Sequence, residues 1–85
     1  MIKVSEKVLI QKLGNESVIL HLDSEEYFGL DEVGTTILDI LIKEQSIKKA
    51  IPILLEEFDI DAIQLKTDIE ELVKSLKKEK ILEDV

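Results

Sequence analysis

The chain contains no cysteine and no arginine, and it has only one proline. The absence of cysteine excludes disulfides, thiolate metal sites and a cysteine nucleophile. It is compatible with a reducing cytosol but does not require that environment. Charged and polar side chains interrupt the N-terminal sequence, so it offers no apolar stretch for a signal peptide or a membrane span. We therefore expect a cytoplasmic protein that has no membrane partner and is stabilised by packing.

The charge is strongly of one sign. All eleven basic residues are lysine and the formal net charge is −8. Arginine is the side chain that forms bidentate hydrogen bonds with phosphates and guanine edges, and an acidic surface repels a phosphate backbone. Nucleic acid is not expected as a partner.

Residues that carry chemistry are scarce. His21 is the only histidine, and without a second histidine or a cysteine the usual zinc, Ser-His-Asp and Cys-His sites cannot be assembled. Gly14, Gly29 and Gly34 are too dispersed to form a phosphate-binding nest. Neighbouring carboxylates such as Glu70-Glu71 diverge by about 100° on a helix and do not make a chelating pair. We predict no catalytic residue, no metal and no cofactor.

The first third of the chain has the composition of strands. An 85-residue chain with 45% apolar content predicts a single domain spanning residues 1–85. Runs rich in Val, Ile, Leu, Tyr and Phe are divided by two segments of turn composition, which predicts an antiparallel meander. The predicted strands are residues 7–13, 17–23 and 26–30. In the second, alternation groups Val18 with Leu20 and Leu22 and leaves His21 on the wetter face.

After Leu30 the apolar period becomes helical. The predicted helices are residues 32–43, 47–58 and 62–78. Asp31 and Ser46 are candidate N-caps, and Asp61 stands three residues before Gln64 with the spacing of a capping box. Ile81 and Leu82 are expected to dock as a short tail. The predicted fold is α+β, a three-stranded antiparallel sheet followed by three helices, similar to a winged helix-turn-helix.

The junction between the third strand and the first helix carries a recognisable order of residues: Leu22-Asp23, Tyr27-Phe28, Gly29-Leu30-Asp31 and Gly34. This order resembles the PqqD-like family, also called RiPP recognition elements. The similarity runs roughly from residue 17 to residue 82. It is closest to the stand-alone proteins that bind the leader peptide in lasso-peptide biosynthesis.

The resemblance implies a non-catalytic protein that binds the leader of a ribosomally made precursor as an added strand, beside the third helix. It would present the precursor to maturation enzymes, a leader peptidase and an ATP-dependent cyclase. Independently of the family, an unpaired strand edge supplies backbone donors and acceptors for such pairing. Alternation predicts Phe28 and Leu30 toward the helices. The candidate peptide-binding residues are Glu26, Tyr27, Phe28, Gly29 and Leu30 on the strand, and Leu65, Lys66, Ile69, Val73, Lys74 and Lys77 on the helix.

Other interpretations stay open at this point. The apolar stripe of the third helix is also explained by core packing alone. Within the family, a peptide chaperone for a radical enzyme, as in pyrroloquinoline quinone or sactipeptide synthesis, is an alternative. Outside it, the same architecture suits a winged-helix regulator, which the charge disfavours, or a homodimer formed through the edge at residues 26–30.

Overall fold

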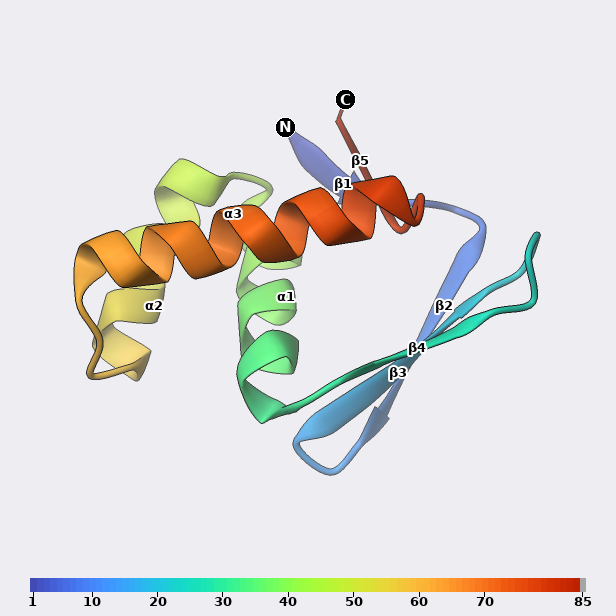
Figure 1. Cartoon of the computed structure of the whole chain (residues 1–85), viewed down its shortest axis with the longest axis horizontal. Coiled ribbons are helices and arrows are strands. Elements are labelled where there is room, and N and C mark those ends of the chain that lie inside the picture. The colour runs from blue at the N-terminus through green and yellow to red at the C-terminus, as the bar shows by residue number, and fades with distance from the viewer. Residues whose placement is uncertain (85) are drawn as a thin grey trace.

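The computed structural model describes residues 1–84, and the chain folds into one sheet of three strands, a small two-stranded sheet and three helices (Figure 1). The larger sheet has the order β2-β3-β4 and is antiparallel throughout. The predicted α+β fold, a three-stranded antiparallel sheet followed by three helices, is confirmed. In chain order the elements are β1 (Ile2–Val4), β2 (Val8–Leu13), β3 (Glu16–His21), β4 (Tyr27–Leu30), α1 (Glu32–Glu44), α2 (Ile47–Glu57), α3 (Ala62–Lys78) and β5 (Leu82–Asp84).

A tight turn fixes the register of the sheet. Leu13 pairs with Glu16, so only Gly14 and Asn15 connect β2 to β3. Gly14 has a φ of 66°, the left-handed conformation that two-residue hairpin turns require and that glycine adopts without a steric penalty. The resulting register sets Ile19 at the centre of the sheet, opposite a residue of each neighbouring strand.

The buried face of β3 is not the one that carries Val18 and Leu20, as expected from sequence, but the other face. Ser17, Ile19 and His21 are buried against the helices, and His21 is only 6% exposed. The prediction that His21 lies on the wetter face is therefore wrong. Both faces of this strand carry apolar residues, so alternation alone could not orient it. The polar residues are accommodated by local bonds, since the backbone N–H of Asp23 donates to Nδ1 of His21 at 3.3 Å.

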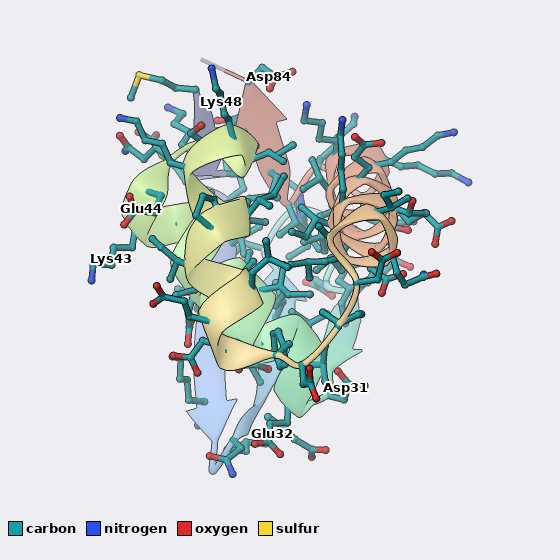
Figure 2. All side chains as sticks on the ribbon, turned by 90° about the vertical axis from the view of Figure 1, so that its left-hand side faces the viewer. Asp31, Glu32, Lys43, Glu44, Lys48 and Asp84 are labelled. Atoms are coloured by element: carbon teal, nitrogen blue, oxygen red, sulfur yellow. The ribbon has the colours of Figure 1, made fainter. Side chains whose placement is uncertain are left out.

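The helices enclose the core on one side of the sheet. Figure 2 shows side chains from all three helices meeting in the space between α2 and α3. The largest side chains with almost no exposed surface are Ile19, Leu38, Leu41, Leu54, Leu65, Ile69 and Ile81. They come from β3, each of the three helices and the segment before β5, so a single core joins sheet and helices.

Two of the three expected helix caps are present. The Asp31 carboxylate accepts a hydrogen bond from the N–H of Gly34 at 2.8 Å, and the Ser46 hydroxyl accepts one from Lys49 at 3.3 Å. Asp61 occupies the N-cap position of α3 as predicted, but its side chain makes no capping bond, so the predicted capping box is wrong. Its presumed partner Gln64 instead donates to the carboxylate of Asp68, one turn further along α3, at 2.8 Å.

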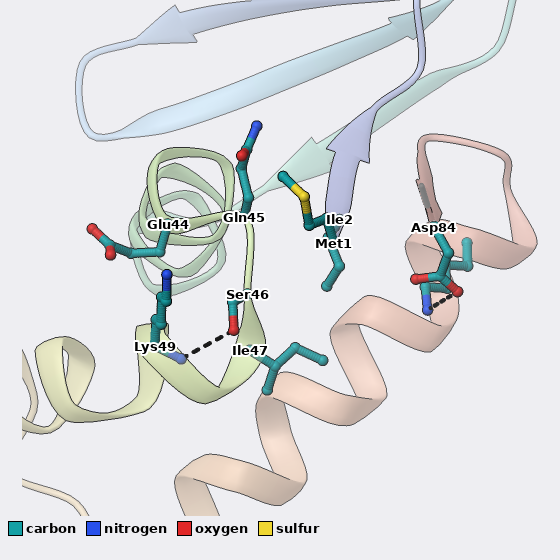
Figure 3. Close-up of a pocket in the computed structure, with 9 residues that line it drawn as sticks. Met1, Ile2, Glu44, Gln45, Ser46, Ile47, Lys49 and Asp84 are labelled. Atoms are coloured by element: carbon teal, nitrogen blue, oxygen red, sulfur yellow. Dashed lines mark hydrogen bonds and ion pairs between the residues drawn. The ribbon is translucent and has the colours of Figure 1, made fainter.

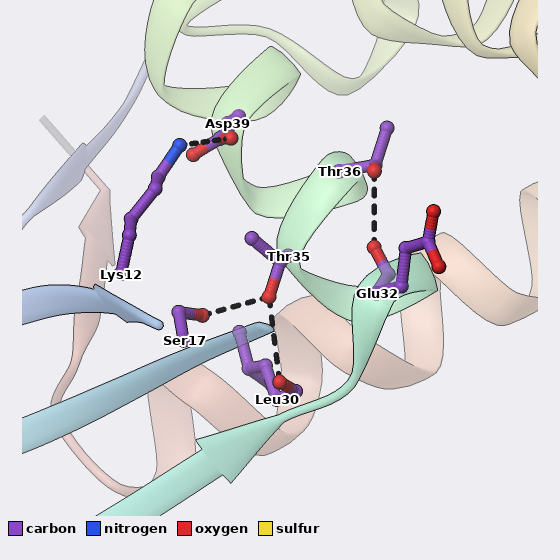
Figure 4. Close-up of polar contacts among 7 residues, drawn as sticks. All are labelled: Lys12, Ser17, Leu30, Glu32, Thr35, Thr36 and Asp39. Atoms are coloured by element: carbon purple, nitrogen blue, oxygen red, sulfur yellow. Dashed lines mark hydrogen bonds and ion pairs between the residues drawn. The ribbon is translucent and has the colours of Figure 1, made fainter. Parts of the chain in front are cut away.

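A buried pair of hydroxyls connects the sheet to the first turn of α1 (Figure 4). The side chains of Ser17 and Thr35 are 2.8 Å apart, and both residues are at most 5% exposed. Thr35 Oγ1 also donates to the carbonyl of Leu30, at 3.4 Å, so the Ser17 hydroxyl is the donor to Thr35. One threonine thus holds the end of β4 and the middle strand against the same helix.

The ends of the chain pair with each other. β1 and β5 form the second sheet, with Val4 opposite Leu82. Ile81 and Leu82 are both buried in the core, which confirms the docking predicted from sequence, but Leu82 also begins a strand that was not predicted. Strands of three residues are too short to show a period, and each pairs with a segment from the opposite end of the chain, which explains why neither was predicted. Lys77 donates to the carboxylate of Asp84 at 2.8 Å (Figure 3).

Replacing Thr35 by valine should destabilise the fold by about 1–3 kcal/mol, because the Ser17 hydroxyl loses its partner in a buried position. The matched control is Thr36→Val. The Thr36 hydroxyl bonds the carbonyl of Glu32 on the helix surface, so its removal should lower the free energy of unfolding less. Urea denaturation measures both. The double variant Ser17→Ala/Thr35→Val should lose less free energy of unfolding than the two single variants lose together. Strictly additive losses would contradict an interaction between the two hydroxyls.

The hydrogen bond from Lys77 lowers the pKa of the Asp84 carboxyl below its ordinary value. An acid with a depressed pKa in the folded state contributes stability above its unfolded pKa, and this is lost as the pH falls through the folded pKa. We expect Lys77→Met to return the pKa of Asp84 toward the ordinary value, as followed by NMR of the carboxyl carbon, whereas Lys78→Met should not. An unchanged titration in Lys77→Met would show that the bond does not persist in solution.

Candidate peptide-binding site

β4 is an edge strand. It pairs with β3 on one side, from Tyr27 opposite Leu20 to Leu30 opposite Ser17, and no strand within residues 1–84 pairs with its other side. Unpaired strand edges present donors and acceptors at the spacing another strand needs. The edge is short, four residues, and it ends where the Asp31 cap begins α1.

The alternation of hydrogen-bonded and non-hydrogen-bonded pairs between β3 and β4 decides which backbone groups of β4 are free. His21 N–H donates to the carbonyl of Glu26 at 2.9 Å, which identifies His21 and Glu26 as a hydrogen-bonded pair. In antiparallel sheets such pairs alternate with pairs that exchange no bond. Phe28 and Leu30 therefore direct their N–H and C=O groups toward β3. Tyr27 and Gly29 direct theirs away from it, to the open side.

The side chains of β4 alternate in the same way. Phe28 and Leu30 are half-buried and pack against the core, as predicted, whereas Tyr27 is 70% exposed on the other face of the sheet. A Cβ added to Gly29 would meet no atom within 4 Å, and the register through Gly29 is continuous, so this glycine marks no bulge. The residues that bond β3 thus build the core, and those with free backbone groups face solvent.

The apolar residues predicted on the third helix lie in the core. Leu65, Ile69 and Val73 are at most 4% exposed, so the unoccupied protein offers almost no surface from them. Lys77 is engaged by Asp84 on β5, and its ammonium is directed to the terminal sheet. The remaining predicted residues of this helix, Lys66 and Lys74, are exposed and make no ion pair within the described part of the chain.

A different side of α3 carries two half-buried residues and leads to a hollow beside the start of β4. Asp68 and Leu72 are half-buried and, with Glu79, follow the spacing i, i+4, i+11 along one side of the helix. Glu79 lines a hollow of about 370 Å³ together with Glu26, which immediately precedes β4. On the helix side this hollow also includes Lys78 and Lys80, and on the sheet side it includes His21.

These flanking residues were missed by sequence analysis. The signal that could have found Asp68 and Leu72 is their position next to the buried stripe, but a sequence does not say which flank of a helix meets a sheet. Lys80 has a φ of 61°, and this left-handed turn after α3 brings it back over the sheet. His21 was misplaced with the rest of its strand.

Three further observations concern metal ions, membranes and a second hollow. No group of three or more His, Cys, Asp or Glu side chains is arranged to hold a metal ion in residues 1–84. In the same range, no helix has the length and apolar character needed to cross a bilayer. A larger hollow of about 440 Å³ lies between the N-terminus and the α1–α2 junction (Figure 3), and it shares no residue with β4.

Comparison with known proteins places the chain in a family. The family model described as coenzyme PQQ synthesis protein D (PqqD) matches residues 16–82. No curated protein sequence matches the chain.

Two solved structures share its fold over nearly their whole length. One, described as TbiB1 in complex with the TbiA(beta) leader peptide, has a TM-score of 0.91 and 28% identity, covering 98% of this chain and 96% of that one. The other, described as lasso peptide synthetase B1 complexed with the leader peptide, has a TM-score of 0.88 and 22% identity, covering 98% of both chains. The chain belongs to the PqqD family, as the residues around β4 had indicated.

Proposed function

We propose that the chain is a non-catalytic recognition protein that binds the leader segment of a ribosomally synthesised precursor peptide. The peptide adds to the free edge of β4 as a fourth strand. The observation that carries this proposal is the set of backbone groups on Tyr27 and Gly29, which point away from β3 and meet no other strand of residues 1–84. Membership of the PqqD family and the similarity to a leader-peptide complex at 28% identity support it.

Specificity arises where the added strand passes between β4 and α3. Every second side chain of a strand points to the same face. One half of the peptide side chains would therefore contact the inner side, where Phe28, Leu30 and Leu72 are half-buried and still offer apolar surface. Leu65, Ile69 and Val73 lie beneath them in the core and fix the shape of this surface. Lys66 and Lys74 remain candidates for acidic leader residues beyond the strand.

Binding the leader would raise the effective concentration of the precursor near an enzyme that modifies it. A tethered leader holds the rest of the precursor near an enzyme at concentrations of roughly millimolar order, without any bond chemistry by the recognition protein. We propose a leader peptidase and a cyclase of lasso-peptide synthesis as the enzymes served, in the cytoplasm. A radical maturation enzyme is the alternative within the same family.

Substitutions at Gly29 test the edge directly. Gly29→Pro removes an outward N–H and sets a ring on the edge, and we expect it to weaken binding at least about tenfold. Gly29→Ala keeps the N–H and adds a methyl group to open space, so its affinity should stay within about twofold of wild type. Fluorescence polarisation with a labelled leader, taken from the precursor encoded beside this chain, measures both. If Gly29→Pro binds as well as Gly29→Ala, the peptide does not pair with β4.

Hydrogen exchange tests the phase of the edge. In the free protein the amides of Tyr27 and Gly29 should exchange rapidly, because they bond no strand, and those of Phe28 and Leu30 should be protected by β3. Saturating leader peptide should slow exchange at Tyr27 and Gly29 specifically. Exchange resolved by NMR for each amide distinguishes this pattern from uniform stabilisation, which would slow all four residues together and would contradict strand addition.

A further inference from the structure

The three-stranded sheet has a second face, which none of the helices in the described part of the chain covers. In Figure 1 all three helices lie on one side of β2, β3 and β4, and the other side is bare. We call the bare side the outer sheet face. Its apolar side chains are Leu9, Leu13, Val18, Leu20, Leu22 and Tyr27. Four of them are large and well exposed: Leu9 by 57%, Leu13 by 56%, Leu22 by 47% and Tyr27 by 70%.

These side chains are contiguous. The register sets Leu20 directly between Leu9 of β2 and Tyr27 of β4, so one row of apolar side chains crosses all three strands. Directly opposed side chains on one face lie about 5 Å apart and touch. An exposed apolar patch of this continuity marks an interaction surface, in contrast to apolar residues scattered singly.

The outer sheet face contains a hollow that combines apolar walls with one negative charge. Leu20, Leu22, Glu25 and Tyr27 enclose about 370 Å³. Glu25 is held in a left-handed conformation, with a φ of 61°, and its N–H donates to the carbonyl of His21 at 2.8 Å. A lysine or arginine fits this hollow, because its stem packs on the leucines while its cation meets a carboxylate and an aromatic ring.

The charges around this face select the occupant. Among the outward positions within the three strands, only Glu16 is charged. Lys12 forms an ion pair with Asp39 on the helix side (Figure 4). Lys7 lines a hollow with His21 on the side of α3. A second copy of this chain would carry the same net charge of −8 and would place its own Glu16 and Glu25 near those of the first copy, where like charges repel. A partner with a basic rim is electrostatically complementary.

We infer that the outer sheet face docks a peptide-maturation enzyme through an apolar surface that inserts a lysine or arginine beside Glu25 and Tyr27. The inference rests on the proposed function. A peptide strand added to β4 continues the same pleat, so every second peptide side chain extends this face. An enzyme docked here contacts the recognition protein and its peptide together, next to the substrate it must process.

The test measures binding of the purified leader peptidase encoded with the precursor, by biolayer interferometry, with leader peptide present. Glu25→Lys reverses the charge in the hollow, and Leu9→Ser removes one end of the apolar row. Each should weaken docking at least tenfold. The matched controls are Glu56→Lys on α2 and Ile63→Ser at the start of α3, two exposed positions away from the sheet, which should dock within about twofold of wild type.

Leader binding by fluorescence polarisation is measured on the same variants and should be unchanged, as should their melting temperatures. If the wild type binds no leader, the proposed function fails, and peptidase docking without peptide still tests the face separately. Undetectable docking of the wild type, or equal docking by Glu25→Lys and Glu56→Lys, overturns the inference. A wild-type dimer in analytical ultracentrifugation that Leu9→Ser dissociates overturns it as well, because the occupant is then a second copy.

Discussion

The position of the sheet against the helices depends on the buried hydroxyl pair of Ser17 and Thr35. Thr35 accepts from the middle strand and donates to the carbonyl at the end of β4, and its backbone N–H closes the first turn of α1 on Asp31. Buried polar groups are costly unless bonded, so only an arrangement that brings all three elements together satisfies both hydroxyls. Apolar packing makes the sheet and the helices adhere, and the hydroxyl pair specifies where.

That anchoring leaves β4 at an edge of the sheet, while the middle strand β3 is paired on both sides. The strand divides its four residues between two tasks. Phe28 and Leu30 bond β3 and fill the core, whereas Tyr27 and Gly29 keep free backbone groups and solvent-facing positions. The period of two that builds the fold therefore also separates the residues needed for stability from those available to a peptide. The proposed peptide site thus lies on residues that contribute little to the core.

The small size of the chain makes its ends part of the structure. A domain of this length buries a limited share of its surface, and every segment that can join the core contributes. β1 and β5 bring Ile2, Ile81 and Leu82 into the same cluster as the helices, and the Lys77 to Asp84 bond fastens the last strand to α3. The same bond removes Lys77 from the set of side chains free to meet a peptide. The net charge of −8 favours basic partners.

The sequence by itself determined the order of the three principal strands and three helices, the caps at Asp31 and Ser46, the alternation along β4, and the family. These features are local, because turn residues, caps and periodicity act between neighbours in the chain. It did not determine which face of β3 is buried, since both faces are apolar enough to pack, and the burial of Ile19 together with the Ser17–Thr35 bond appears only in the folded chain. Nor did it reveal the terminal strands or the hollow between Glu26 and the end of α3. Those depend on contacts between residues far apart in the sequence, which form only once the helices have packed against the sheet.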